Sequence, residues 1–252
     1  MPGINIFPDL KANVYEARSG LLYYPKTGYF KIDIGDARDI LKYSSAASSE
    51  YSFGSEFFVH ALGLNIKTKR LPIDAAEGYF GIHFSYSDSS KSLKARLRVL
   101  HNSSHLVDGH LERGSTYSSS IDYVKDYAEL TILRSFKIGR NNLDCYLGAA
   151  YAIVIHPHNL KKFTGNAGMQ MSVYKIADSL FERPVDLFWA YNFNLSSIPA
   201  YIGNSHFTTG VRFGNWDAAA LTLYLSYYIG TSLFNQYYNK RVNEFSIGFY
   251  ID

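Results

Sequence analysis

The fold is decided by one stretch, Leu93-Lys94-Ala95-Arg96-Leu97-Arg98-Val99-Leu100-His101-Asn102-Ser103-Ser104-His105. In its first half, apolar residues occupy every second position, and lysine and arginine occupy the positions between them. This alternation is typical of a β-strand, because successive side chains of a strand point to opposite faces of the sheet. The apolar face continues as His101, Ser103 and His105. A candidate base and a candidate nucleophile therefore share the apolar side of the predicted strand.

The same period of two returns in the segments 79–86, 143–155, 185–195, 219–229 and 244–251. Segments of about ten residues with one apolar and one polar face are the signature of a transmembrane β-barrel. A soluble β-sandwich or a lipocalin-like barrel also alternates. The predicted strands are longer than the usual length of about 5–6 residues, however, and aromatic residues gather near their ends. We therefore predict an all-β fold, a single antiparallel transmembrane β-barrel of about twelve strands.

The predicted strands lie near 18–25, 28–35, 51–67, 76–88, 91–105, 118–135, 142–156, 165–177, 184–196, 201–213, 218–230 and 242–252. Short connections alternate with longer ones, which lie at 110–117, 157–164 and 231–241. Short turns of such barrels face the periplasm, so His101 to His105 are expected near the outer rim. The stretch Gly35–Glu50 breaks the rule, and Asp36–Lys42 is expected to form a helical turn or a plug. We expect one domain over 1–252, with residues 1–17 as an N-terminal periplasmic segment.

Composition narrows the class of protein further. The chain has 252 residues, of which 16% are aromatic and 19% are charged, and its formal net charge is +3. Its basic residues are scattered, so nucleic acid is not an expected partner. The lone Cys145 excludes an intrachain disulfide, and no apolar run reaches the roughly 20 residues of a transmembrane helix. No signal peptide is visible before Pro2-Gly3, so we expect a mature form with an added start methionine.

The pair His101 and Ser103 suggests nucleophilic catalysis. The two residues lie roughly 6–7 Å apart along a strand, and a serine becomes a nucleophile when a histidine takes its proton. A third group normally orients the imidazole, and the next strand offers Asp122. If the connecting loop is symmetric, His101 faces Asp122 and Ser103 faces Ser120. The sequence therefore predicts a catalytic set of Ser103, His101 and Asp122 that faces lipid.

The spacing His-x-Ser by itself carries little information, because His83-Phe84-Ser85 repeats it. The parity of that second pair places it on the polar, lumenal face of its strand. The apolar face and the nearby acid therefore carry the prediction for the first pair. Further candidates around it are Ser104, His105, Arg98 and Ser120.

The same residues carry a family resemblance. Arg96 and Arg98, followed by His101-x-Ser103-Ser104-His105-Leu106-x-Asp108, resemble the signature of an uncharacterised family of Gram-negative outer-membrane proteins with a domain of unknown function. Weaker similarity extends through 6–10, 120–123, 183–195, 228–237 and 245–249. Val107 and Gly109-His110 depart from the Gly-Asp-Glu expected around Asp108. The resemblance implies an outer-membrane location and a barrel, and it implies no activity.

A more distant likeness concerns chemistry. Outer-membrane phospholipase A and lipid A 3-O-deacylase are similar in having a lipid-facing His-x-Ser, and the former is a twelve-stranded barrel. This likeness implies that Ser103 is the nucleophile, His101 the base and Asp122 the orienting residue. Ser104-His105 replace the Asn-Gly of the phospholipase, so its oxyanion and calcium details do not carry over. Asp108 is the one candidate ligand for Ca²⁺, a cation that prefers hard oxygen ligands.

Three functions remain open from the sequence. The first is an outer-membrane lipid acyl-ester hydrolase, whose partners are outer-leaflet phospholipid or lipopolysaccharide. The second is a small channel or transporter, because the inward face is polar. The third is a noncatalytic structural barrel that acts through the loops 110–117 and 231–241.

Overall fold

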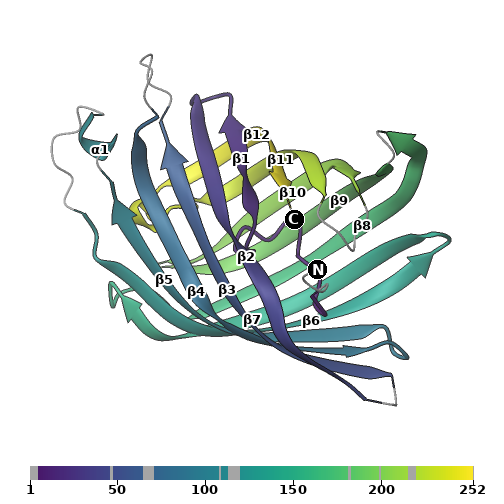
Figure 1. Cartoon of the computed structure of the whole chain (residues 1–252). Coiled ribbons are helices and arrows are strands. Elements are labelled where there is room, and N and C mark those ends of the chain that lie inside the picture. Colours follow the sequence, from purple (N-terminus) through teal and green to yellow (C-terminus); the bar gives the residue numbers. More distant parts are fainter. Residues whose placement is uncertain are drawn as a thin grey trace.

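The computed structural model describes residues 5–45, 48–64, 71–107, 109–112, 120–180, 183–198, 200–214 and 220–251. Within them the chain forms a closed antiparallel barrel of twelve strands, in which β1 pairs with β12 (Figure 1). The predicted fold class is confirmed. The strands are β1 (Ser19–Tyr24), β2 (Tyr29–Ser44), β3 (Ser49–Gly63), β4 (Ile73–Asp88), β5 (Leu93–Leu106), β6 (Tyr123–Ile138), β7 (Asn141–His156), β8 (Phe163–Leu180), β9 (Arg183–Ile198), β10 (Ala200–Phe213), β11 (Leu221–Thr231) and β12 (Arg241–Ile251).

The two faces of the wall are inverted relative to a soluble protein. Large apolar side chains point outward and are exposed, as Phe80 (54%) and Leu147 (68%) illustrate. Charged and hydroxyl side chains point inward and are buried, as Arg98 and Thr131 are. A closed barrel leaves no strand edge unpaired, which is the condition for a sheet to cross a bilayer. The outward wall is therefore the lipid-facing surface.

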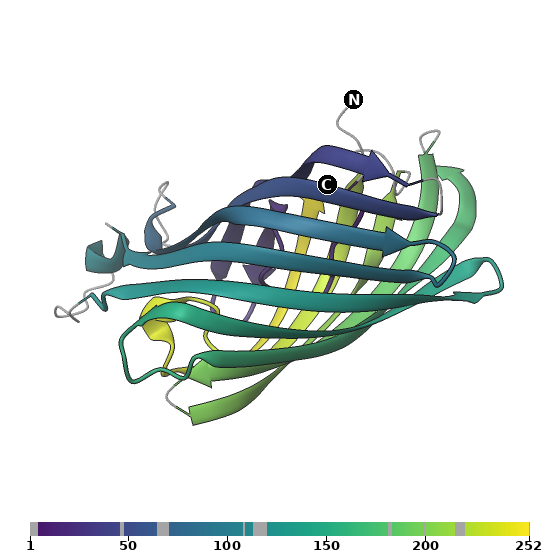
Figure 2. The same cartoon turned by 90° about the horizontal axis from the view of Figure 1, so that it is seen from below.

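The two ends of the barrel differ in their connections. Strands β4 and β5 are joined by Ser89–Ser92, and β6 and β7 by Gly139-Arg140. At the other end the β5–β6 and β11–β12 connections are long and carry α1 (Gly109–Glu112) and the 3-10 helix η1 (Asn235–Tyr237), which Figure 2 shows at one end of the molecule. At the same end, β1 and β2 are joined by only four residues and β9 and β10 by one. The predicted alternation of short turns and long loops holds from β4 to β8, whereas the single-residue β9–β10 connection and the seven-residue β10–β11 connection depart from it. None of the helices in the described part of the chain has the length and apolar character that a membrane crossing needs.

The N-terminal segment lies inside the barrel. The prediction of a periplasmic segment over 1–17 is therefore wrong for its described part. Phe7 and Leu10 are buried against Leu133 and Tyr146 of the inner wall. The physical reason is that the inward faces of twelve strands enclose space that side chains from the wall do not fill completely, and an amphipathic segment fills part of it.

A buried network of charges holds this segment in place. The guanidinium of Arg98 donates from Nη2 to Glu129 Oε1 (2.6 Å) and from Nη1 to the carbonyl oxygen of Tyr15 (3.0 Å). The guanidinium of Arg96 donates to both carboxylate oxygens of Glu16, at 3.0 and 2.5 Å. Pairs of arginine with carboxylate have a specific geometry, and a bidentate pair such as Arg96–Glu16 is stronger than a pair with a single hydrogen bond. The network therefore ties β5 and β6 to the N-terminal segment inside the barrel.

The expected helical turn or plug over Asp36–Lys42 is wrong. These residues belong to β2, which pairs with β3 as far as Ser44↔Glu50. The register shifts between Asp39 and Leu41, which is the mark of a β-bulge. A bulge inserts one residue and breaks the period of two, so the sequence pattern alone did not reveal a continuous strand.

We predict that Glu16→Ala lowers the thermal stability of the barrel substantially. The substitution leaves the buried Arg96 guanidinium without its carboxylate, and breaking a buried pair in this way costs about 3–5 kcal/mol. The control is Arg38→Ala, which removes the exposed Arg38–Asp36 pair and is expected to cost about 0–1 kcal/mol. The measurement is the temperature at which the compact form is lost on semi-native gels. Equal shifts for the two variants would contradict the proposed anchoring.

Candidate functional site

The candidate site lies on the outward face of β5, near the long-loop end. His101 is paired across the ladder with Phe80 of β4 on one side and with Asp126 of β6 on the other. All three side chains point to the lipid-facing surface. The exposed fractions of the His101 and Asp126 side chains are 30% and 41%. The imidazole is therefore reachable from the lipid phase.

A carboxylate orients the imidazole. Nδ1 of His101 lies 2.6 Å from Oδ1 of Asp126. A carboxylate only accepts hydrogen bonds, so Nδ1 is the protonated nitrogen of this pair. In the neutral ring, Nε2 then carries the lone pair that can take a proton. The His101–Asp126 pair has the geometry in which an acid fixes the tautomer of a general base.

The ring of Phe80 provides the other wall for the imidazole. The centroids of the Phe80 and His101 rings lie 4.6 Å apart, with 36° between the ring planes. This separation lies within the range of favourable aromatic contacts. The imidazole is thus held between β4 and β6, and its orientation does not depend on the long loops.

Ser103 follows two residues later on the same face and is half-buried. Its neighbours across the ladder are Gly78 of β4 and Val124 of β6. No hydrogen bond joins Ser103 and His101, both of which belong to the described part of the chain. Catalytic hydrogen bonds are often long without substrate and tighten in the complex.

The predicted register, in which His101 faces Asp122, is wrong. The observed register pairs His101 with Asp126 and Ser103 with Val124, so the symmetric-loop register is shifted by four residues along β6. Strand β6 begins at Tyr123, and both Asp122 and Ser120 are exposed residues that precede it. The physical reason is that the β5–β6 connection is longer than the sequence pattern suggested and includes α1.

The remaining candidates divide between the two faces of β5. Ser104 and Arg98 point into the barrel and are buried, whereas His105 is exposed. The second motif, His83-Phe84-Ser85, has its histidine and serine buried inside, as predicted, and His83 Nε2 lies 2.9 Å from Asp39 Oδ1. Asp108, the predicted Ca²⁺ ligand, lies outside the described residues. Those described contain no group of three or more His, Cys, Asp or Glu side chains that could hold a metal ion.

Hydrogen bonds to one buried carboxylate hold the inward-facing side chains of β5 at the height of the candidate site. Asn102 and Ser104 alternate with His101 and Ser103 and donate to the buried Glu77 carboxylate. Asn235 of η1 donates to the same carboxylate from its backbone N–H (2.6 Å) and from Nδ2 (2.7 Å). The β11–β12 loop therefore folds into the barrel and supports the strand that carries the candidate pair. The sequence marks Glu77 only as an inward polar residue, and nothing in its pattern connects it to Asn235.

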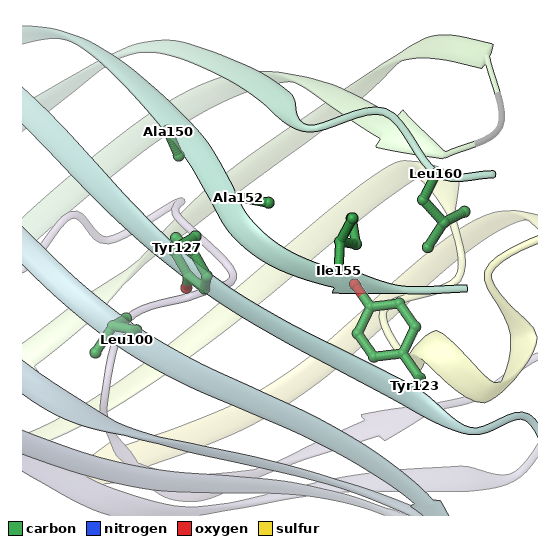
Figure 3. Packing of buried hydrophobic residues seen from close by; sticks show 7 residues of the cluster. All are labelled: Leu100, Tyr123, Tyr127, Ala150, Ala152, Ile155 and Leu160. Carbon is green, nitrogen blue, oxygen red and sulfur yellow. The ribbon is translucent and has the colours of Figure 1, made fainter. Parts of the chain in front are cut away.

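Apolar packing supports the same region from within. A buried cluster lines the inner face behind the candidate pair and consists of Leu100, Tyr123, Tyr127, Ala150, Ala152, Ile155 and Leu160 (Figure 3). The β6–β7 ladder has a register shift between Asp126 and Tyr127, at the position of the orienting acid. Bulges often lie next to active sites, where they redirect a side chain.

A separate cavity of about 170 Å³ lies in the lumen. Its walls come from the N-terminal segment, from strands β1–β3 and β10–β12 and from the β11–β12 loop, and include Arg18, Tyr24, Tyr224 and Tyr228. It shares no lining residue with the candidate pair on the outer wall. The space within the barrel and the lipid-facing pair are therefore distinct features.

Comparison with known proteins agrees with this architecture. A family model described as "Protein of unknown function (DUF1207)" matches residues 79–251. No curated protein sequence matches the chain. Among solved structures, outer membrane phospholipase A from Escherichia coli aligns with a TM-score of 0.56 and 10% identity, over 95% of this chain and 93% of that one. The beta domain of the Bordetella autotransporter BrkA aligns with a TM-score of 0.48 and 11% identity, over 92% and 95%. The likeness to the phospholipase shows that the chain has the fold of an outer-membrane barrel.

We predict that a disulfide forms between His101→Cys and Asp126→Cys in a Cys145→Ser background. Directly opposed residues of an antiparallel pair have Cα atoms about 4.5–5.5 Å apart, within the range that a disulfide bridges. The control pair is His101→Cys with Asp122→Cys, since residue 122 lies roughly 13 Å farther along the chain direction. Mass tagging of free thiols after oxidation is the measurement. Cross-linking of the control pair alone would contradict the register.

Proposed function

The chain belongs to this family, whose description assigns no function, and we propose that it is an outer-membrane acyl-ester hydrolase that acts on membrane lipids. The observation that carries the proposal is the His101–Asp126 pair beside Ser103 on the lipid-facing wall. A lipid in the surrounding leaflet would reach these groups without leaving the membrane. The structural likeness to a phospholipase is consistent with this proposal but shows the fold alone.

The polarity of the wall around Ser103 matches that of an ester lipid. Toward the middle of the barrel, the outward residues of β5 are Val99 and Leu97, each 41% exposed. Toward the long loops, the next outward residue of β5 is the exposed His105. A lipid ester lies between an apolar chain and a polar headgroup, so Ser103 stands at the height where such an ester would lie. In this proposal, His105 contacts the headgroup.

The proposed reaction proceeds through an acyl-enzyme. Ser103 Oγ attacks the ester carbonyl carbon while Nε2 of His101 accepts the hydroxyl proton. The tetrahedral intermediate collapses, the ester C–O bond breaks, and His101 returns the proton to the leaving alkoxide. Water then attacks the acyl-enzyme with His101 as the base, which releases the fatty acid and restores Ser103. Throughout, Asp126 holds the imidazole and stabilises its protonated form.

The alternative of a small channel has less support. The described N-terminal segment occupies part of the lumen and is anchored by the Arg96 and Arg98 network. The cavity of about 170 Å³ is the feature that would favour solute passage. The lipid-facing pair has no role in a channel, whereas a hydrolase uses it directly.

We predict that Ser103→Ala lowers release of fatty acid from phospholipid vesicles or mixed micelles by roughly 10³-fold or more, because the nucleophile is lost. The matched control is Ser85→Ala, which alters the inward member of the second His-x-Ser motif and is expected to retain activity. Both variants should keep the compact form on semi-native gels. A folded wild-type barrel that hydrolyses neither phospholipid nor lipopolysaccharide would refute the proposed function.

We predict that Asp126→Ala reduces kcat by roughly 10²–10⁴-fold with little change in KM, because the imidazole loses its orienting acceptor. Asp126→Asn should restore part of the activity, since its amide oxygen can accept the same hydrogen bond. Asp122→Ala serves as the control and is expected to leave kcat unchanged. A loss of activity in Asp122→Ala and not in Asp126→Ala would reverse the assignment of the acid.

A further inference from the structure

A side chain is missing from the outer wall directly beside the candidate nucleophile. Gly78 of β4 lies opposite Ser103 of β5 and, on its other side, opposite Val59 of β3. A Cβ placed on Gly78 would have one neighbour within 4 Å, Ser103 Oγ at 3.7 Å. The wall therefore has a notch at this position, which opens toward the lipid phase.

Crowding does not explain this glycine. A Cβ on Gly81, three residues later and inside the barrel, would lie 2.0 Å from the carbonyl oxygen of Val99, so that position excludes any side chain. Gly78 has ordinary van der Waals space and no positive φ. A strand residue without a side chain also weakens the strand. The close approach of another molecule is a reason for a glycine at such a position.

The notch has apolar borders. Along β4 the next outward residues are Ala76 and Phe80, and across the ladder the border is Val59. Beyond it toward the middle of the barrel, Phe57 and Phe80 are paired and exposed at 58% and 54%. None of these side chains is charged. The notch is therefore suited to a hydrocarbon chain and not to a headgroup.

The width of the notch limits what it can hold. Val59 and Ser103 stand on strands two spacings apart, roughly 9–10 Å. Carbon atoms in contact are about 3.5–4 Å apart, so the space between the two side chains takes one alkyl chain. A chain that carries a second acyl group close to its carbonyl is about twice as wide at that point.

We propose that Gly78 forms the floor of an acyl-chain subsite, which seats the first carbons of one unbranched chain while the ester carbonyl meets Ser103. The preferred substrates are then esters of linear fatty acids, such as glycerophospholipids, over esters whose chains are branched near the carbonyl, as in the acyloxyacyl groups of lipid A. This inference rests on the proposed hydrolase function and specifies its substrate class.

The test is Gly78→Val, assayed in the full-length folded barrel with two substrates. Hydrolysis of a phospholipid with linear long chains is expected to fall at least tenfold in kcat/KM, because the side chain fills the seat. Hydrolysis of 4-nitrophenyl acetate, which has only a methyl group to seat, is expected to fall by a much smaller factor, so the ratio of long-chain to acetate hydrolysis decreases. Gly165→Val is the matched control, since Gly165 is an outward strand residue whose added Cβ would meet only a ring carbon of Phe163 at 3.7 Å. It should change neither rate.

A second variant, Val59→Ala, widens the notch. It is expected to raise the rate on acyloxyacyl esters relative to linear esters several-fold. An unchanged ratio of long-chain to acetate hydrolysis in Gly78→Val would overturn the subsite while the proposed hydrolase stands. If Gly78→Val loses both activities, the Val59→Ala variant decides the question. An unchanged ratio of acyloxyacyl-ester to linear-ester hydrolysis in that variant overturns the subsite. Absence of wild-type activity on every ester, the acetate included, would remove the proposed function and the subsite together.

Discussion

The structure depends on the closure of one hydrogen-bonded ladder. Residues Ser19–Tyr23 of β1 pair with Ile247–Ile251 of β12, so every strand has two neighbours. In hydrocarbon, an unpaired backbone N–H or C=O costs several kcal/mol, which leaves closed barrels as the only spanning sheets. Closure divides the side chains into an apolar outer set and a polar inner set. Both the partly filled lumen and the lipid-facing site are consequences of that division.

The polar inner set creates a problem that the N-terminal segment solves. Arg98 is fully buried, and a buried guanidinium requires partners on several sides. It finds Glu129 and Glu56 on the wall and the carbonyl oxygen of Tyr15 on the segment. The segment therefore belongs to the interior of the barrel in the same sense as a core belongs to a soluble domain.

The candidate site uses both faces of one strand. On the outer face, β5 presents His101 and Ser103 between β4 and β6. On the inner face, Asn102 and Ser104 bond to Glu77, which Asn235 of η1 also contacts. A loop near the end of the chain thereby supports a pair near its middle. Groups that must meet a substrate within fractions of an ångström gain from this support, because small displacements of catalytic groups reduce rates strongly.

Sequence pattern alone determined the class of fold, the number of strands and the face on which each residue of β5 lies, since side-chain alternation is a local property of a strand. It also placed an acid beside His101, but it selected Asp122 and not Asp126. A slip of four residues is even, so it preserves every face and changes only the partner. Hydrogen bonding between strands sets that register, as it sets the position of Gly78 beside Ser103. The bulge in β2, the buried N-terminal segment and the contact of Asn235 with Glu77 also depend on residues that are distant in the sequence. The tertiary structure therefore decided which residues meet, because the local pattern of a strand carries no information about its partners.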